Sequence, residues 1–197
     1  MLADDLLALT QALGVEQFSV CGVSLGGMVA LQSALQAPGR ISRAVVCSTA
    51  RRIAPPPNGW DGRQRAALEG GMAPLADGMV ARMFSAAWRA SHAPAVASLR
   101  SVFERTDPAG YAGACAVLRD ADVGSGLARV IAPTLVVSGE DDPLCPPAAA
   151  RQLANGLAKA RHLLLPGGHF PPLEAACEFA EAVVAHIGAP DSHDGGS

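Results

Sequence analysis

The sequence has no long uninterrupted apolar run and no excess of positive charge. No stretch approaches the roughly 18 consecutive apolar residues of a membrane span, so we expect no membrane association. The formal net charge of -3 gives no reason to expect nucleic acid or an anionic membrane as a partner. Residues 1–5 carry no basic side chain and do not read as a signal peptide, so a cytoplasmic location is expected by default.

Cysteine pairs and metal-ligand clusters are also missing from the sequence. The five cysteines are odd in number and form no C-x-x-C pair, so we expect free thiols that are mostly buried as small hydrophobic side chains. Cys145 lies in an acidic loop, which leaves its reactivity open. No group of His, Cys and Asp residues has the spacing of a metal site, and we expect no metal.

What the sequence does contain is an alternation of short apolar segments and helical patterns. The chain has 197 residues, half of them hydrophobic, which indicates one domain with a sizeable core. Alternating strands and helices predict a parallel sheet with right-handed crossovers, with functional residues at the carboxyl ends of the strands. Strands are expected over residues 17–21, 41–47, 133–138 and 160–165, and helices over 2–13, 25–36, 147–157 and 173–187.

The middle of the chain interrupts this alternation. A proline-rich loop over residues 55–59 is followed by a long stretch without a convincing strand, in which helical segments are expected over 61–70, 75–87, 94–105 and 109–118. We interpret residues 55–128 as a helical cap inserted into a core formed by residues 1–54 and 129–187. Residues 188–197 are expected to be a disordered tail.

A G-x-S-x-G pentapeptide, residues 22–26, stands between the first expected strand and the following helix. In this context the motif is typical of a nucleophile elbow, a strained turn that presents the hydroxyl of Ser24 above the sheet edge. Side chains at Gly22 or Gly26 are expected to collide with the adjoining strand and helix. The backbone N–H of Leu25 is the expected donor to an oxyanion. The alternative is a glycine-rich turn with an idle serine.

Two further loops follow expected strands and supply an acid and a base. Asp142 lies three residues past the glycine that ends one strand, just before a proline, and His169 follows two glycines after the next strand. Serine, acid and histidine in this order are typical of α/β-hydrolases. The histidine takes the serine proton, and the acid orients the imidazole. Glu140 and Asp141 compete for the acid role, with Asp141 as the reserve, and capping of a turn or helix is the structural alternative.

With these motifs the chain resembles the α/β-hydrolase superfamily over essentially its whole length, and more narrowly the 3-oxoadipate enol-lactonases. Besides the triad, this resemblance rests on the elbow segment, the segment after the second strand, and the start and end of the cap. These are residues 21–27, 48–53, 75–78 with 82–84, and 110–122. The last stretch is the most specific, since cap sequences differ widely between hydrolase families.

The resemblance implies hydrolysis of an enol-lactone, a small-molecule substrate, to 3-oxoadipate without a metal or cofactor. Arg52 and Arg119 are then candidates for holding a substrate carboxylate, and salt bridges on the surface or within the cap are their alternative role. Two departures from the family keep other functions open. Residues 169–174 read more like a general esterase or a haloperoxidase-type hydrolase, which favours a general carboxylesterase.

The second departure is that the front of the family's domain, with its first strands and the loop of a second oxyanion donor, is missing. We therefore expect an α/β-hydrolase fold that lacks its first strands and has about four. The strand over residues 17–21 would then be an open edge, which favours self-association. Met1 fits an internal methionine of a longer reading frame and also the start of a natural fragment. A truncated, non-catalytic remnant that binds a ligand or a partner chain is the remaining alternative.

Overall fold

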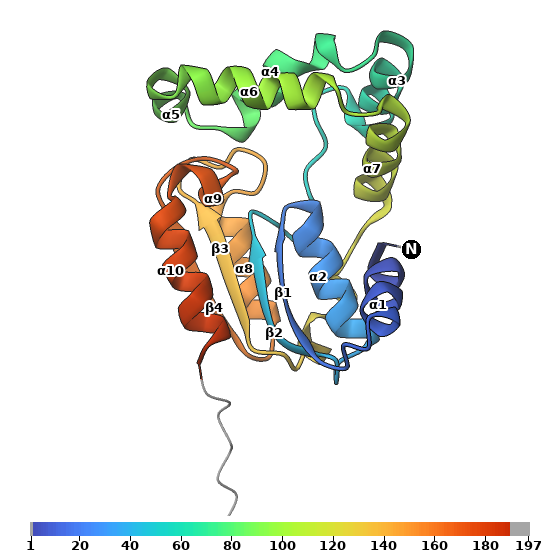
Figure 1. The fold of residues 1–197 in the computed structure, drawn as a ribbon, viewed down its shortest axis with the longest axis vertical. Coiled ribbons are helices and arrows are strands. Elements are labelled where there is room, and N and C mark those ends of the chain that lie inside the picture. Colours follow the sequence, from blue (N-terminus) through green and yellow to red (C-terminus); the bar gives the residue numbers. More distant parts are fainter. Residues whose placement is uncertain (1, 190–197) are drawn as a thin grey trace, which may run out of the picture.

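A parallel β-sheet forms the centre of the protein. In the computed structural model, which describes residues 2–189, strands β1 (Phe18–Val23), β2 (Ile41–Cys47), β3 (Thr134–Gly139) and β4 (Ala160–Leu165) lie side by side in this order (Figure 1). Each neighbouring pair is parallel. The predicted α/β fold with a parallel sheet of about four strands is confirmed, and β1 and β4 are the edges of the described sheet.

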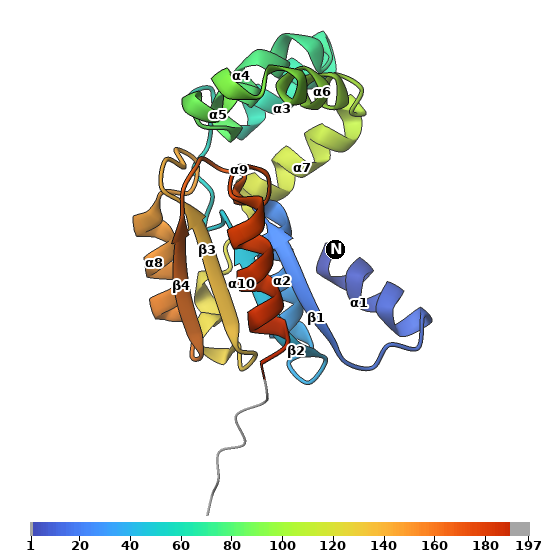
Figure 2. The ribbon, with the colours of Figure 1, turned by 60° about the vertical axis from the view of Figure 1, so that its left-hand side comes forward.

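Helices cover both faces of the sheet because successive strand residues point to opposite sides. On β2, Ala44 and Val46 belong to the larger core cluster, which also contains side chains of α2 (Leu25–Gln36) and α8 (Pro147–Gly156). Val45 and Cys47 belong to a second cluster, against which α10 (Ala176–Ile187) packs. Figure 2 shows α10 on one face and α2 and α8 on the other. All four β2 residues are fully buried, as the continuous apolar runs predicted.

The N-terminal helix α1 (Leu2–Ala12) lies against α2 and away from the sheet (Figure 1). Only Ala3 of this helix is buried, and Leu9 is 58% exposed. The helix therefore carries apolar side chains into solvent. After it, Gly14 forms the turn toward β1 with a φ of 70°, a conformation that favours glycine.

The predicted helical insertion is present between β2 and β3. It consists of α3 (Gly59–Gly70), α4 (Ala73–Met83), α5 (Ala86–Ser91), α6 (Ala93–Glu104) and α7 (Pro108–Asp120). In these helices α3 packs on α7 and α4 on α6, and together they lie above the carboxyl ends of the strands (Figure 1). A 3-10 helix, Gly124–Arg129, which the sequence did not predict, leads back to β3.

Two helices expected to be continuous are interrupted, the first by two residues and the second by one. Phe84 has φ -121° and ψ 142°, an extended conformation that separates α4 from α5. Ala175 has φ -133° and ψ 53° and separates the short helix α9 (Pro171–Glu174) from α10. Both breaks lie beside the predicted histidine loop, and they allow the chain to turn there.

The chain ends show no further element within the described part. Between residues 2 and 189, no helix is both long and apolar enough to cross a membrane. The predicted tail over residues 188–197 lies outside the described residues from position 190 onward.

Candidate active site

Ser24 occupies a strained turn between β1 and α2. Its φ of 55° and ψ of -118° lie outside the regions that side-chain-bearing residues normally adopt. The Ser24 N–H donates to the carbonyl of Cys47 on β2 at 2.8 Å, and its carbonyl accepts from the N–H of Gly27 at 2.9 Å. Strand pairing on one side and the first helical turn on the other thus hold a conformation that costs of the order of 1–3 kcal/mol.

The glycines around Ser24 have different roles. A Cβ at Gly22 would lie 2.2 Å from the carbonyl oxygen of Gly26, so a side chain there is excluded by backbone. A Cβ at Gly26 would meet no atom of a neighbouring element within 4 Å, and the expectation that a side chain at Gly26 collides is wrong. The tight position on the helix is Gly27, where a Cβ would lie 2.8 Å from the Thr49 side chain.

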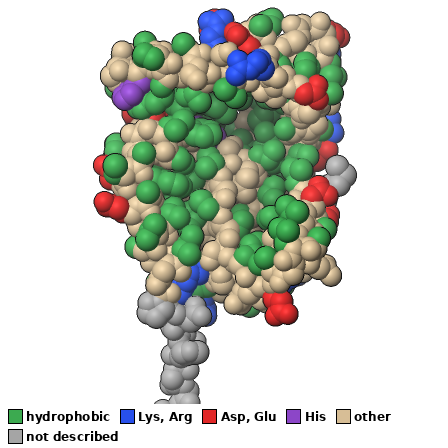
Figure 3. All heavy atoms as spheres, in the orientation of Figure 1, with side chains coloured by type: hydrophobic (Ala, Val, Ile, Leu, Met, Phe, Trp, Pro, Cys, Tyr) green, Lys and Arg blue, Asp and Glu red, His purple; other side chains and the backbone are tan. Residues whose placement is uncertain are grey.

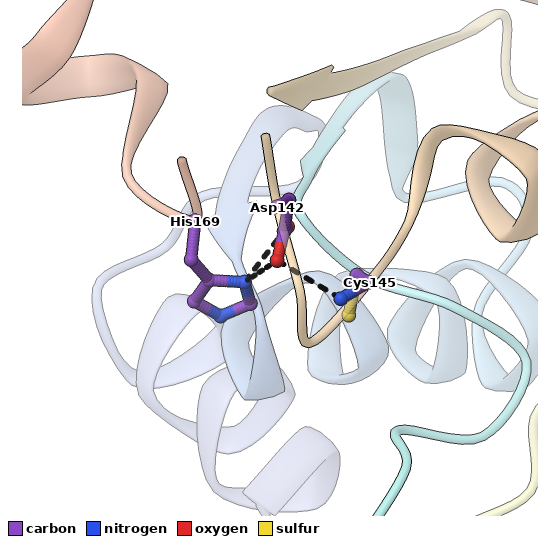
Figure 4. A group of neighbouring side chains, drawn as sticks. All are labelled: Asp142, Cys145 and His169. Atoms are coloured by element: carbon purple, nitrogen blue, oxygen red, sulfur yellow. Dashed lines mark hydrogen bonds and ion pairs between the residues drawn. The ribbon is translucent and has the colours of Figure 1, made fainter. Parts of the chain in front are cut away.

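The predicted acid and base are hydrogen-bonded to each other in the interior. His169 Nδ1 lies 2.8 Å from Oδ2 and 3.0 Å from Oδ1 of Asp142, and the two residues are 1% and 3% exposed (Figure 4). Asp142 Oδ1 also accepts from the N–H groups of Leu144 at 2.8 Å and Cys145 at 3.0 Å. A carboxylate only accepts hydrogen bonds, so with Asp142 in that form Nδ1 of His169 is the donor and Nε2 is left as the acceptor. Glu140 and Asp141 are exposed.

Cys145 approaches the same pair without joining its hydrogen bonds through sulfur. Ligand atoms of Asp142, Cys145 and His169 lie within 4.8 Å of one another, a separation that a metal ion could bridge. However, Nδ1 of the histidine already faces the carboxylate, and the thiol is fully buried in the larger core cluster. Burial, and next the charge of Asp142, raise the pKa of the Cys145 thiol well above its usual value. We therefore assign Cys145 to packing and to its backbone hydrogen bond.

Ser24 and His169 line one cavity between the sheet and the cap. Its volume is about 80 Å³, so it is small for a ligand site. Most of its walls are apolar and come from both the core and the cap: Ile53, Trp60, Met79, Met83, Cys115, Leu118 and Leu144. The structure thus brings the predicted nucleophile and base to the same enclosed space, and their catalytic roles stay predictions.

Two arginines of the cap, Arg63 on α3 and Arg82 on α4, also line this cavity. Arg63 donates from Nε to the Tyr111 hydroxyl and from a terminal nitrogen to Met79 Sδ at 2.9 Å. Burial, and next the charge of Arg63, lower the pKa of Arg82 below its usual value. Among residues 2–189, neither guanidinium forms an ion pair with a carboxylate. The cavity therefore holds two cationic groups without a counter-ion from the described part of the chain.

Arg52 and Arg119, the predicted carboxylate-binding candidates, lie elsewhere. Arg52 Nε is 3.0 Å from Asp122, whose other oxygen binds Arg51 at 2.9 Å. Arg119 is paired with Asp61 at 2.7 Å and with its neighbour Asp120. Neither side chain lines the cavity with Ser24. These contacts are the salt bridges that the sequence left as the alternative role.

Sequence reasoning missed Arg63 and Arg82, although each carried a signal. Arg63 follows Trp60 by three residues on α3, and Arg82 follows Met79 by three residues on α4. Residues three apart share a helix face, so each arginine lies on a face that carries a large apolar residue. A cationic side chain on an apolar face is uncommon without a partner or a ligand.

Leu25 is the first residue of α2, directly after Ser24. The first N–H groups of a helix have no intrahelical acceptor and carry the positive end of the helix dipole. The predicted oxyanion donor therefore stands at a helix start, next to the predicted nucleophile.

Comparison with known proteins gives one consistent family. The family model described as "alpha/beta hydrolase fold" matches residues 1–176. A 3-oxoadipate enol-lactonase of Acinetobacter baylyi is 29% identical over 184 residues, which is 93% of this chain and 68% of that protein. A protein of Variovorax paradoxus named among the RutD carbamate hydrolases is 30% identical over 200 residues, with 96% and 74% covered. The crystal structure of an enol-lactonase from Burkholderia xenovorans superposes with a TM-score of 0.91 at 34% identity, over 95% of this chain and 72% of that one.

Proposed function

Because the chain belongs to the α/β-hydrolase fold family, we propose that it hydrolyses a small lactone or ester that carries a carboxylate, with 3-oxoadipate enol-lactone as the substrate. The observation that carries this proposal is that two guanidinium groups, those of Arg63 and Arg82, line the cavity with Ser24 and His169 and have no carboxylate partner among residues 2–189. A substrate carboxylate gains charge-assisted hydrogen bonds there that a neutral ester does not. The likeness to enol-lactonases in sequence and in structure supports the same substrate.

In the proposed reaction the first step forms an acyl-enzyme. His169 Nε2 takes the proton from Ser24 Oγ while this oxygen attacks the lactone carbonyl, and Asp142 stabilises the imidazolium that results. The Leu25 N–H donates to the carbonyl oxygen as it gains negative charge. When the tetrahedral intermediate collapses, the ring C–O bond breaks and the imidazolium returns its proton to the leaving enol oxygen.

The second step consumes one water molecule. Because the leaving enol remains part of the same molecule, the acyl-enzyme retains the whole ring-opened substrate. His169 then takes a proton from water, the resulting hydroxide attacks the acyl carbon, and Ser24 leaves as the alcohol. The product has a new carboxylate, and its enol converts to the ketone.

A general carboxylesterase is the second candidate function. The apolar cavity walls favour it, because Ile53, Trp60 and Leu144 suit an alkyl or aryl ester without charge. The loop from His169 to Glu174, which resembles general esterases, points the same way.

Active-site labelling tests the nucleophile before any substrate is chosen. A fluorophosphonate should label the parent protein and fail to label Ser24→Ala. Ser19→Ala and Ser33→Ala are matched controls, since their hydroxyls bond to Ser42 and to the Val29 carbonyl and should leave labelling unchanged. A Ser24→Ala variant that labels at the parental rate refutes the nucleophile, and an unlabelled parent favours a non-catalytic binding protein.

Substitution of the cavity arginines tests the substrate class. In Arg63→Met or Arg82→Met the kcat/KM for the enol-lactone should fall about 10- to 100-fold, the equivalent of one lost hydrogen bond to a charged group. The kcat/KM for a neutral p-nitrophenyl ester should change by less than about threefold. Arg52→Met and Arg119→Met, whose guanidiniums pair with carboxylates outside the cavity, are the controls. Equal losses on both substrates contradict the carboxylate-binding role, and an equal parental kcat/KM for both leaves the general esterase.

A further inference from the structure

The loop that carries His169 is hydrogen-bonded to the cap. The His169 N–H donates to the carbonyl of Met83, the last residue of α4, at 2.9 Å. One residue earlier, the Gly168 N–H donates to Glu174 Oε1 at 2.9 Å. The other oxygen of this carboxylate, Oε2, accepts from the Ser85 N–H of the cap at 3.0 Å. A single carboxylate therefore bridges the histidine loop and the cap.

The surrounding backbone is shaped for this bridge. Gly167 has a φ of 101°, and a Cβ there would lie 2.7 Å from Glu174 Cβ. A Cβ at Gly168 would lie 2.9 Å from the Ser85 nitrogen and 3.0 Å from Glu174 Oε1. Side chains at these two positions would thus separate the loop, the carboxylate and the cap. Among residues 2–189, no Lys or Arg forms an ion pair with Glu174, so its two backbone donors are its partners.

Aromatic packing reinforces the same junction. Phe84, between the two cap residues that bond to the loop, is 6% exposed. Its ring lies 4.9 Å from that of Trp88 on α5 and 5.8 Å from that of Phe170, the residue after His169. Residues 83–85 of the cap and 168–170 of the loop consequently pack as one body.

We propose that Glu174 is a positioning residue that couples the placement of the cap to the placement of the His169 imidazole toward Ser24. This inference rests on the proposed hydrolase function, since it assigns His169 as the base. When the cap sits on the core, Glu174 holds Gly168 and Ser85 together and the imidazole faces the cavity. When the bridge is broken, the loop gains freedom and the reacting atoms lose alignment.

Two variants remove the bridge from opposite sides. Glu174→Gln places an amide N–H₂ against one of the two backbone donors. Ser85→Pro removes the cap donor itself, and the backbone permits it, because Ser85 has φ -59° and Phe84 has the extended conformation that a following proline requires. Ser85 Oγ also caps α5 by accepting from the Trp88 N–H. Ser85→Ala, which loses only this hydroxyl, is therefore the reference for Ser85→Pro. Glu178→Gln, at an exposed position of α10, is the reference for Glu174→Gln.

The rate of Ser24 labelling by a fluorophosphonate measures alignment without a substrate. We expect a 10- to 100-fold lower rate at saturating reagent in Glu174→Gln, and in Ser85→Pro relative to Ser85→Ala, as misplacement by about 1 Å produces. The double variant should be no slower than the slower single variant, because both remove one bridge. Glu178→Gln should label at the parental rate. Losses that multiply in the double variant, or a parental rate in Glu174→Gln, overturn the proposal.

Hydrogen exchange separates this proposal from the proposed function. In Glu174→Gln the Ser85 and Gly168 amides should exchange at least about tenfold faster than in the parent, while amides of β3 keep their rates. Unchanged exchange at both amides refutes the bridge, whatever the labelling shows. If the amides exchange faster but the parent protein is not labelled, the bridge between the loop and the cap stands. The hydrolase assignment and the positioning role of Glu174 are then both refuted.

Discussion

Replacing Gly22 and Gly26 separately by alanine tests the elbow. In the structure a side chain fits at Gly26 but not at Gly22, although both glycines belong to one motif. A Cβ at Gly22 would lie 2.2 Å from the Gly26 carbonyl oxygen, whereas a Cβ at Gly26 meets no neighbouring element within 4 Å. An ordinary carbon–oxygen contact needs more than about 3 Å, so Gly22→Ala must move the first turn of α2 by about 1 Å. No side-chain rotation relieves this overlap, since the atom in the way belongs to the backbone.

The two substitutions should change the free energy of unfolding in opposite directions. Overpacking costs about 1–3 kcal/mol where side chains can adjust, so Gly22→Ala should lower the free energy of unfolding by at least about 3 kcal/mol. Moving Ser24 by about 1 Å should slow fluorophosphonate labelling about 100-fold. Gly26→Ala, near the start of a helix, should instead raise the free energy of unfolding by up to about 1 kcal/mol, with labelling within about threefold of the parent.

Urea unfolding followed by circular dichroism, together with the labelling rate, measures both effects. Comparison of the two alanine variants removes the general effect of a methyl group. If Gly26→Ala is as damaging as Gly22→Ala, or if Gly22→Ala matches the parent in both assays, the geometric argument for the elbow would be refuted.

Two further predictions concern stability and association. Thr49 Oγ1 is a buried atom without a hydrogen-bond partner among the described residues, so Thr49→Val should raise the free energy of unfolding by about 1 kcal/mol; Thr134→Val, which loses a 2.9 Å bond to the Ala132 carbonyl, should lower it by about the same amount. Two losses of equal size would contradict this. The outer edge of β1 pairs with no strand among residues 2–189, and hydrophobic side chains gather on the face below the cap (Figure 3), so sedimentation velocity should show self-association that increases with concentration. A single monomeric species over a wide concentration range would contradict it.

The positions of the strands and of the predicted triad could be derived from the sequence alone. The strand of residues 41–47 and the helix of residues 25–36 were predicted to the residue, because glycine, proline and the apolar period mark their ends. In a parallel sheet the carboxyl ends of all strands meet at one edge. All three predicted residues follow strands at that edge, where Ser24 and His169 line one cavity and Asp142 is hydrogen-bonded to His169.

Which charged side chains face that cavity was decided by tertiary structure. Arg52 and Arg119 are ion-paired on the surface, while Arg63 and Arg82 point inward from the cap. Helical spacing places Arg63 and Arg82 on faces with a large apolar residue, but which face turns toward the cavity depends on the helices against which each cap helix packs. For the same reason, sequence spacing suggested that Gly26 was as crowded as Gly22, whereas only the packed elbow shows which one has space.

The bridge by Glu174 is the clearest case of a feature that sequence reasoning could not reach. Glu174 and Ser85 are 89 positions apart, and the donor is a backbone N–H that every residue except proline carries. No residue type at position 85 marks the contact. It exists because extended residue Phe84 and the short helix α9 bring an unpaired N–H and a free carboxylate oxygen within 3.0 Å, and that distance is a property of the fold.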